Sequence, residues 1–194
     1  ADLEALVNEA AIDATMHGKE CIEHADLEEA RDKVRWGRAR KSRVLDEAEQ
    51  EMTAYHEAGH ALVQILVPEA DPLHKVSIIP RGPALGATFA LPEKDRYSYS
   101  RKYCMALISV ALGGRLAEET FCGDISSGAQ NDIAQATEIA KKMVLDWGMS
   151  EKVGLVNYNN DDKRIMPMDV SGKNYSERTA EVVDGEIRAI IDRA

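Results

Sequence analysis

Apolar residues recur at steps of three and four along most of the chain, which predicts a mainly α-helical fold. The first two stretches of this kind are residues 2–16 and 24–36, separated by a break around Gly18. Two helices this short bury little apolar surface by themselves, so we expect them to complete a larger unit. The basic segment 35–43 then indicates a domain boundary, either as a solvated linker or as a contact with a neighbouring domain or subunit.

The same periodicity predicts a long central helix over residues 45–67. Acidic residues crowd its first turns, where the helix dipole favours them, and Pro68 ends it. The stripe expected to face the core steps by three and four residues and consists of Leu45, Ala48, Met52, Tyr55, Gly59, Leu62 and Leu66.

Two short β-branched or aromatic stretches, residues 75–80 and 86–92, predict a hairpin or a pair of neighbouring strands. Helical patterns return at residues 100–121, 132–148 and 176–194, with one further strand suggested by "GLVNY" at residues 154–158. We therefore predict a mainly α (α+β) fold in which a small β-sheet lies beside the central helix.

Composition narrows the class of protein. An apolar fraction of 44% and a charged fraction of 30% are typical of a soluble globular domain. The net charge of −10 gives no general attraction to nucleic-acid phosphates. No apolar stretch is long enough to span a bilayer, and the first residues lack the pattern of a signal peptide. Three widely spaced cysteines, Cys21, Cys104 and Cys122, favour semi-buried thiols in a reducing compartment.

Candidate chemistry begins inside the central helix, where residues 56–60 read "HEAGH". Residues four apart on a helix project from the same side, so His56 and His60 can bind one metal ion. Glu57 is rotated away from both histidines, but it can reach a water molecule at the metal and act as a general base. The motif therefore predicts a zinc hydrolase site at the margin of the buried face.

A catalytic zinc takes a third protein ligand, and the sequence leaves its identity open. A third histidine six residues after His60 is excluded, because that position holds Leu66. His74 is expected in a loop and is a weak candidate. Spacing alone does not choose between Glu118 or Glu119 on the next long helix and Asp132 near the start of the helix after it. The remaining candidates are Glu118, Glu119 and Asp132.

The chain resembles the peptidase domain of the membrane-anchored AAA+ zinc proteases of the FtsH type. The resemblance rests on motifs in the family's order between residues 45 and 156. These are "TAYHEAGHALV", "DPLHKVSIIPRG", "GGRLAEE" and "SSGAQNDIAQATEIAKKMVLDWGMSEKVG". The start, "ADLEALVNEAA", is similar to the last helices of the family's AAA+ lid. The resemblance therefore implies a lid remnant and linker at residues 1–40 and a zinc peptidase domain at residues 41–194, truncated at its C-terminus.

The family's site can be transferred by position. It implies that His56, His60 and Asp132 are the zinc ligands, that Glu57 is the catalytic base, and that Glu118 lies close to the zinc without binding it. It further implies substrates that are unfolded or membrane-extracted proteins, delivered through a homo-hexameric ring by ATP hydrolysis. The printed sequence holds no G-x-x-x-x-G-K-[ST] motif, so ATP and Mg²⁺ are expected only in an ATPase domain of the parent protein.

We expect the parent to be membrane-anchored through a segment that precedes the ATPase, with this domain in the bacterial cytoplasm or in an organelle matrix or stroma. One departure from the family lies at residues 157–173, which lack a short Gly-Phe-Leu-Gly-like stretch often found there. The predicted function is a zinc metalloendopeptidase. The alternatives are a non-catalytic helical assembly module with a structural metal and a zinc hydrolase acting on a small amide.

Overall fold

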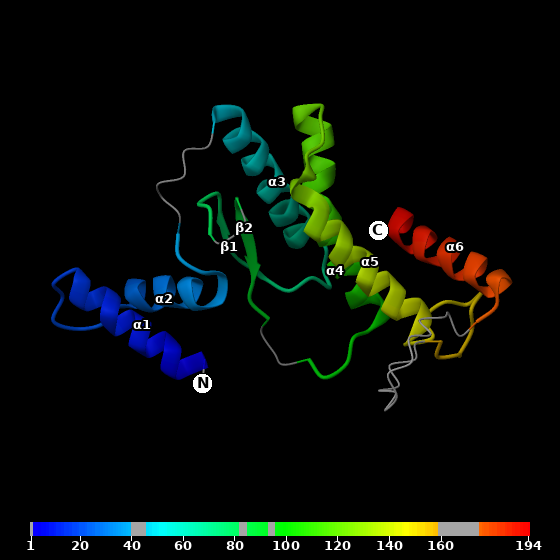
Figure 1. The fold of residues 1–194 in the computed structure, drawn as a ribbon, viewed down its shortest axis with the longest axis horizontal. Helices are drawn as coiled ribbons and strands as arrows, with labels where there is room; N and C mark the ends of the chain where they lie inside the picture. Colours follow the sequence, from blue (N-terminus) through cyan, green and yellow to red (C-terminus); the bar gives the residue numbers. More distant parts are fainter. Residues whose placement is uncertain (1, 40–45, 82–84, 93–95, 159–174) are drawn as a thin grey trace, which may run out of the picture. The chain divides into compact units, whose positions relative to one another are not determined.

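The computed structural model of the protein describes residues 2–39, 46–81, 85–92, 96–158 and 175–194. These residues form two compact units (Figure 1). The first contains residues 1–54 and 76–87, and the second contains residues 55–75 and 88–194. The basic segment 35–43 and the departure from the family at residues 157–173 lie partly outside the described residues.

The first unit is built on a helical hairpin. The periodicity predicts helices α1 (Asp2–Met16) and α2 (His24–Trp36), and in the structure they pack against each other. Small residues make their contact close, because Ala10, Ala14 and Ala30 are buried. Arg81 binds α2 through Glu29 at 2.7 Å, so the segment that follows the first strand is held against this hairpin by a buried cation.

Helix α3 (Glu47–Leu66) is the predicted central helix, but most of its predicted inward stripe is not buried. Gly59 is buried as predicted, and Leu45 lies outside the described residues. Tyr55, Leu62 and Leu66 are 38%, 56% and 68% exposed. The buried side carries polar groups instead, including Glu57, His60 and Gln64. Their burial is balanced by hydrogen bonds; the Gln64 side-chain amide, for example, donates to the Asp71 carbonyl at 2.8 Å.

Strands β1 (Leu73–Ser77) and β2 (Ala87–Ala90) form the predicted small sheet. Strand β1 begins earlier than the pattern indicates, so His74 lies in the strand and not in a loop. The strand suggested at residues 154–158 does not form; Gly154 lies there at a φ of 82° and the described residues around it make turns and bends.

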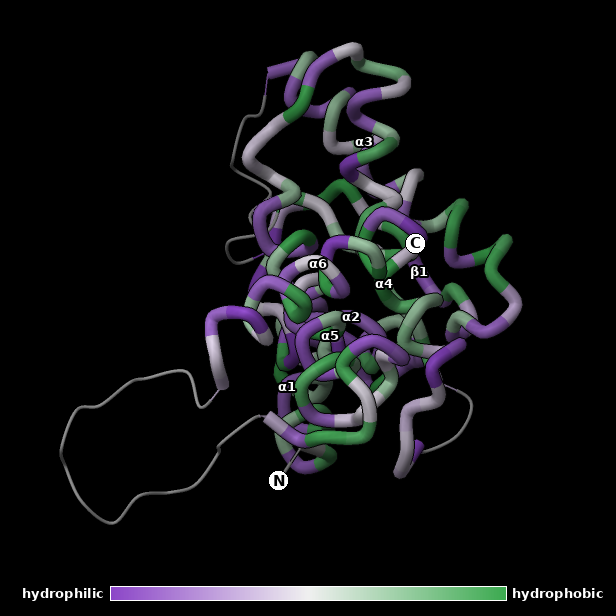
Figure 2. Tube along the Cα trace, turned by 90° about the vertical axis from the view of Figure 1, so that its right-hand side faces the viewer, coloured by the Kyte–Doolittle hydropathy of each residue, from purple (hydrophilic) through white to green (hydrophobic). Residues whose placement is uncertain are grey.

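The core of the second unit lies among α4 (Arg101–Ala117), α5 (Gln130–Leu145) and α6 (Glu177–Arg193). Figure 1 shows α5 between α4 and α6, and both neighbours pack against it. Hydrophobic and hydrophilic positions alternate around the helical turns (Figure 2), as amphipathic helices require. The largest fully buried apolar side chains of this core are Ile108, Met143, Val144 and Val183.

Two short elements connect α4 to α5. A π-helical turn, Glu118–Cys122, extends α4 and ends at Gly123, which has a φ of 70° that favours glycine. A 3₁₀ turn, Ser127–Ala129, then leads into α5. This connection sets the positions of Glu118 and Asp132 relative to each other.

Among the described residues, none of the helices is both long and apolar enough to cross a bilayer. The cysteines differ in environment: Cys104 is buried, Cys122 is intermediate and Cys21 is exposed. Only Cys104 is therefore a buried core thiol, and the expectation of semi-buried thiols is wrong for Cys21.

Candidate metal centre and active site

The two motif histidines lie on one side of α3, as their spacing predicts. The Nε2 atoms of His56 and His60 are 3.0 Å apart. Their rings meet edge to face, with centroids 4.6 Å apart. Both ε nitrogens are therefore directed at one point beside the helix.

Asp132 approaches this point from α5. Its Oδ2 atom lies 3.2 Å from Nε2 of His56 and 3.6 Å from Nε2 of His60. Within the described part of the chain, these three residues are the one group of three or more histidine, cysteine or acidic side chains able to share a cation. Asp132 is in the first turn of α5, which directly follows the 3₁₀ turn Ser127–Ala129.

Glu118 lies behind His56. Its Oε1 atom is 2.8 Å from Nδ1 of His56, on the opposite side of the ring from Asp132. The Ser126 backbone N–H donates to Oε2 of Glu118 at 2.8 Å, and the Ser126 hydroxyl donates to Oε1 at 3.1 Å. Glu118 is only 1% exposed, so it is a buried carboxylate that connects His56 to the turn before α5.

The other candidates for a third ligand lie elsewhere. The Glu119 carboxylate accepts a hydrogen bond from Arg115 at 3.0 Å and is exposed. His74 is exposed in β1 and does not belong to the histidine–aspartate group.

The δ nitrogens orient the imidazole rings. Nδ1 of His60 is 2.7 Å from the carbonyl oxygen of Val110 on α4, an acceptor that requires a proton on Nδ1. The Glu118 carboxylate plays the same part for His56. With a metal ion bound, the ε nitrogens would be deprotonated and would offer it their lone pairs, which is the tautomer that a metal ligand needs.

A glycine contact brings α3 and α4 close enough for these bonds. A β-carbon on Gly59 would lie 2.4 Å from the carbonyl oxygen of Gly113 and 2.6 Å from Cβ of Ala117. The helix backbones therefore meet where no side chain fits between them. This close contact explains why the motif "HEAGH" holds a glycine at position 59.

The charges in the site affect one another's ionisation. Burial of Asp132 opposes ionisation, but hydrogen bonds from His56 and His60 outweigh it and lower its pKa to about 2. Burial lowers the pKa of His56, but hydrogen bonds to Asp132 and Glu118 outweigh that effect and raise it. Asp132 is therefore ionised over the physiological pH range, as a cation ligand must be.

Glu57 occupies a different environment from the three grouped residues. It is 6% exposed, and its Oε2 atom accepts a hydrogen bond from the Thr88 hydroxyl at 2.6 Å. Burial raises the pKa of Glu57, while the Thr88 hydrogen bond and the nearby histidines oppose that rise. Nothing in the spacing of the sequence identifies Thr88, because the contact depends on how β2 packs beside α3.

Comparison with known proteins assigns the family. Residues 43–194 match the sequence profile described as Peptidase family M41. The chain belongs to peptidase family M41. Family membership agrees with the mainly α fold and with the predicted resemblance to FtsH-type proteases.

Named relatives of this M41 chain are similar along all of it. It is 52% identical over 196 residues to "ATP-dependent zinc metalloprotease FtsH 2" of Methylacidiphilum infernorum, covering 100% of this chain and 31% of the relative. It is 52% identical over 196 residues to "ATP-dependent zinc metalloprotease FtsH" of Rubrobacter xylanophilus, covering 100% of this chain and 30% of the relative. The protein of that name from Photobacterium profundum is 51% identical over 197 residues, with 100% of this chain and 28% of the relative covered. The chain thus spans about three-tenths of the length of these curated relatives.

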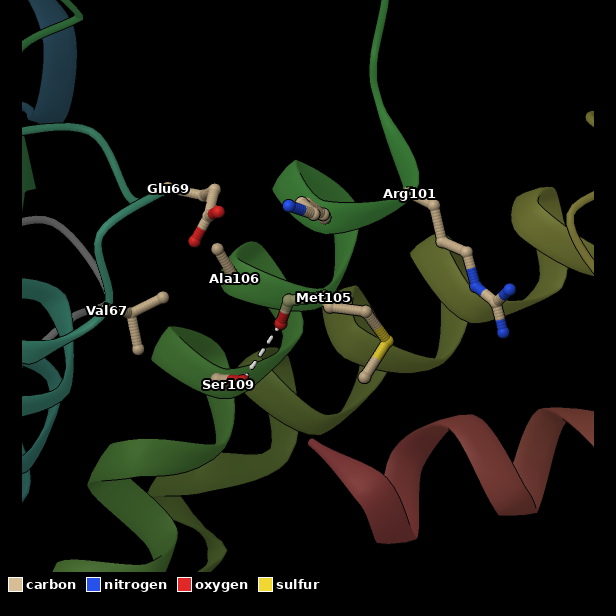
Figure 3. A pocket seen from close by; sticks show the side chains of 7 residues that line it. Val67, Glu69, Arg101, Met105, Ala106 and Ser109 are labelled. Carbon is tan, nitrogen blue, oxygen red and sulfur yellow. Dashed lines mark hydrogen bonds between the residues drawn. The ribbon is translucent and has the colours of Figure 1, made fainter.

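The M41 chain also has an open hollow that excludes the grouped residues. Val67 and Glu69, which follow α3, line it together with five residues of α4: Arg101, Lys102, Met105, Ala106 and Ser109 (Figure 3). The Ser109 hydroxyl donates a hydrogen bond to the Met105 backbone carbonyl oxygen at 2.9 Å. With no histidine, aspartate or cysteine in its lining, this hollow is a poor candidate for the zinc chemistry.

Proposed function

We propose that this chain is the zinc metalloendopeptidase part of an FtsH-type protease. The observation that carries the proposal is the convergence of the His56, His60 and Asp132 ligand atoms at separations of 3.0, 3.2 and 3.6 Å. Glu57 lies on the same helix, next to His56. The names of the relatives, which specify a zinc metalloprotease, support the same reading.

The donor set fits zinc. Two imidazole nitrogens and one carboxylate oxygen are ligands that zinc prefers, and tetrahedral bonds of ~2.0–2.1 Å place neighbouring ligand atoms roughly 3.3 Å apart. The observed separations of 3.0 to 3.6 Å bracket that value. Hydrogen bonds from the δ nitrogens to Glu118 and to the Val110 carbonyl hold both rings in the orientation that binding requires.

The proposed reaction is hydrolysis of a peptide bond by water. Bound zinc supplies a Lewis acid that polarises the carbonyl group and makes water more acidic. The Glu57 carboxylate accepts a proton from the attacking water, whose oxygen bonds to the carbonyl carbon. Glu57 then returns this proton to the departing nitrogen as the carbon–nitrogen bond breaks. The products are a carboxylic acid and an amine, and no covalent bond to the protein forms.

Three ligands, and not four, favour catalysis over the structural-metal alternative. A structural zinc is enclosed by four protein ligands, whereas a catalytic zinc keeps a position open. The grouping within the described residues contains three ligand side chains, and the buried Glu57 has no use in a purely structural site. These observations support an enzyme and not an assembly module.

The substrate is proposed to be an extended polypeptide. Strand β2 carries Thr88, which contacts Glu57, and an extended chain paired along such a strand would lie beside the base. Pairing through backbone hydrogen bonds depends little on the side chains of the substrate. It therefore suits unfolded or membrane-extracted proteins of varied sequence. The strand also favours protein over a small amide as substrate.

The parent assembly is part of the same proposal. In it, a homo-hexameric AAA+ ring would use ATP and Mg²⁺ to deliver substrates to this domain. The parent would be membrane-anchored, with the domain in the bacterial cytoplasm or an organelle matrix or stroma. Residues 1–40 would be the end of the AAA+ lid and its linker, and residues 41–194 the peptidase domain.

Metal content and cleavage of a short fluorogenic peptide test the site together, because a short peptide needs no threading. We expect Glu57→Gln to retain one zinc per chain and to lose cleavage. At saturating zinc, Asp132→Ala should lose the metal while Glu118→Ala keeps it. Zinc loss in the Glu118 variant alone would overturn the ligand assignment, and wild-type turnover by Glu57→Gln would overturn the mechanism. Cleavage of unfolded casein then tests the substrate class.

A further inference from the structure

The hydrogen bond between Thr88 and Glu57 has a short, directional geometry. The Thr88 hydroxyl lies 2.6 Å from Oε2 of Glu57 and 3.1 Å from the Glu57 backbone carbonyl oxygen. A hydroxyl has one proton to donate, and the shorter distance falls in the range of charge-assisted O–H···O⁻ bonds. The proton is therefore directed mainly at the carboxylate.

This hydrogen bond engages one oxygen of the Glu57 carboxylate, Oε2, and leaves the other, Oε1, without a hydrogen bond from Thr88. Within the described part of the chain, Thr88 is the one side chain that hydrogen-bonds to the Glu57 carboxylate. With Oε2 held, Oε1 is available to take a proton from water, and rotation of the carboxylate is restricted. Such pre-organisation lowers the cost of reaching the transition state, because the base does not have to be reoriented during the reaction.

The position of Thr88 also links strand β2 to Glu57. Thr88 is in β2, and the same residue contacts both the side chain and the backbone of Glu57. A peptide bound along β2 would thus lie on a strand whose distance from the base is fixed by Thr88. One hydroxyl would set both the direction of the carboxylate and the distance from base to substrate strand.

We infer that Thr88 is a positioning residue that holds the Glu57 carboxylate in the orientation needed for proton transfer. The inference rests on the proposed peptidase function. Thr88 does not belong to the grouped metal ligands, so its effect should fall on turnover and not on zinc binding.

Three variants separate this role from packing. Thr88→Val keeps the shape and removes the hydroxyl; Thr88→Ser keeps the hydroxyl and removes the methyl group. Thr137→Val is the matched control, because the half-buried Thr137 hydroxyl donates to the Ile133 carbonyl within its own helix, at 2.7 Å. For each variant, kcat and KM for the short peptide, zinc content and thermal unfolding are measured.

We expect Thr88→Val to bind zinc as the wild type does and to lose about 10- to 100-fold in kcat with little change in KM, the scale of an orienting contact. Thr88→Ser should recover most of kcat, and Thr137→Val should match the wild type. Unchanged kcat in Thr88→Val, zinc loss in that variant, or equal impairment of the Ser and Val variants would each overturn the inference. Glu57→Gln, assayed in parallel, separates the two ideas: if it still cleaves, the proposed function fails; if it is inactive while Thr88→Val is fully active, only the role of Thr88 fails.

Discussion

Gly114 lies directly against the imidazole ring of His60. A β-carbon at position 114 would lie 2.5 Å from Nε2 of His60 and 2.7 Å from Cε1 of His56. These distances are shorter than any contact a real β-carbon makes, and the atoms concerned belong to both predicted histidine ligands. Helix α4 therefore supports the metal centre by the absence of a side chain as well as by the Val110 carbonyl.

Gly114→Ala should abolish zinc binding while leaving the helices intact. The added methyl group must displace the ring atoms that face Asp132, because the backbone of a buried helix has little freedom to move. We expect a loss of zinc and of peptide cleavage together. Helical content by circular dichroism should remain that of the wild type.

Gly185→Ala is the matched control for this change. Gly185 lies inside α6, and a β-carbon there would meet no atom within 4 Å. Alanine at this position should stabilise the helix by about 0.5–1 kcal/mol and leave zinc content unchanged. Normal zinc content in Gly114→Ala would show that the histidine rings are not confined as described.

Gly59→Ala should act on stability first. Its β-carbon would lie 2.4 Å from the Gly113 carbonyl oxygen, so α3 and α4 would have to separate. We expect destabilisation of about 1–3 kcal/mol, the usual cost of overpacking, in contrast to the gain at Gly185. Urea denaturation of the two alanine variants measures the difference. Equal stability of Gly59→Ala and the wild type would contradict the close backbone contact.

Glu118→Gln should weaken zinc binding without removing it. The change keeps the size of the side chain but removes the negative charge that faces Nδ1 of His56 and the Ser126 hydroxyl. Loss of such an orienting partner reduces metal affinity by about 10- to 100-fold. Ser126→Ala should give a smaller loss, because the Ser126 backbone N–H still donates to Glu118. Competition with a chromogenic chelator measures both affinities, and a Ser126 effect larger than the Glu118 effect would argue against this order.

In the central helix α3, sequence patterns predict the histidine spacing correctly but not the buried face. The spacing of His56 and His60 predicts two side chains on one face, and their ε nitrogens are 3.0 Å apart. The apolar stripe predicts the wrong inward face, because hydrogen bonds allow Gln64 and His60 to be buried while Leu62 and Leu66 are exposed. Periodicity registers only apolar residues, so it does not detect a helix face whose buried residues are polar and hydrogen-bonded.

Contacts between distant segments are the part that spacing cannot provide. Spacing does not choose between Asp132 and the pair Glu118 or Glu119, and the family resemblance favours Asp132. In the structure, Asp132 lies within 3.6 Å of both ε nitrogens, whereas Glu118 lies at a δ nitrogen. The difference depends on the π-helical turn and the 3₁₀ turn between α4 and α5, for which the sequence has no periodic signal. Spacing does not indicate Thr88 for the same reason, since its partner Glu57 is 31 residues away in the sequence.

Tyr103→Phe should give a stability difference that depends on pH. The buried Tyr103 hydroxyl donates to Oδ2 of Asp71 at 2.6 Å, and Arg96 lies 3.2 Å from Oδ1 of the same carboxylate. Burial, followed by the hydrogen bond to Asp71, raises the pKa of Tyr103 to about 12. The unfolded value is about 10, so the fold favours the neutral phenol. That contribution to stability is complete below about pH 10 and is lost as the pH rises through about 12.

At pH 8 we expect Tyr103→Phe to be less stable than the wild type by about 1–2 kcal/mol, because the buried Asp71 carboxylate loses a donor. The difference should shrink between pH 10 and 12, because the wild type must then ionise a buried phenol and the variant has none. Urea denaturation of both proteins at each pH measures this change. Tyr97→Phe is the control, since Tyr97 is 97% exposed and should show no difference at either pH. A Tyr103 difference that stays constant to pH 12 would mean that the hydroxyl is not held neutral by Asp71 and its buried surroundings.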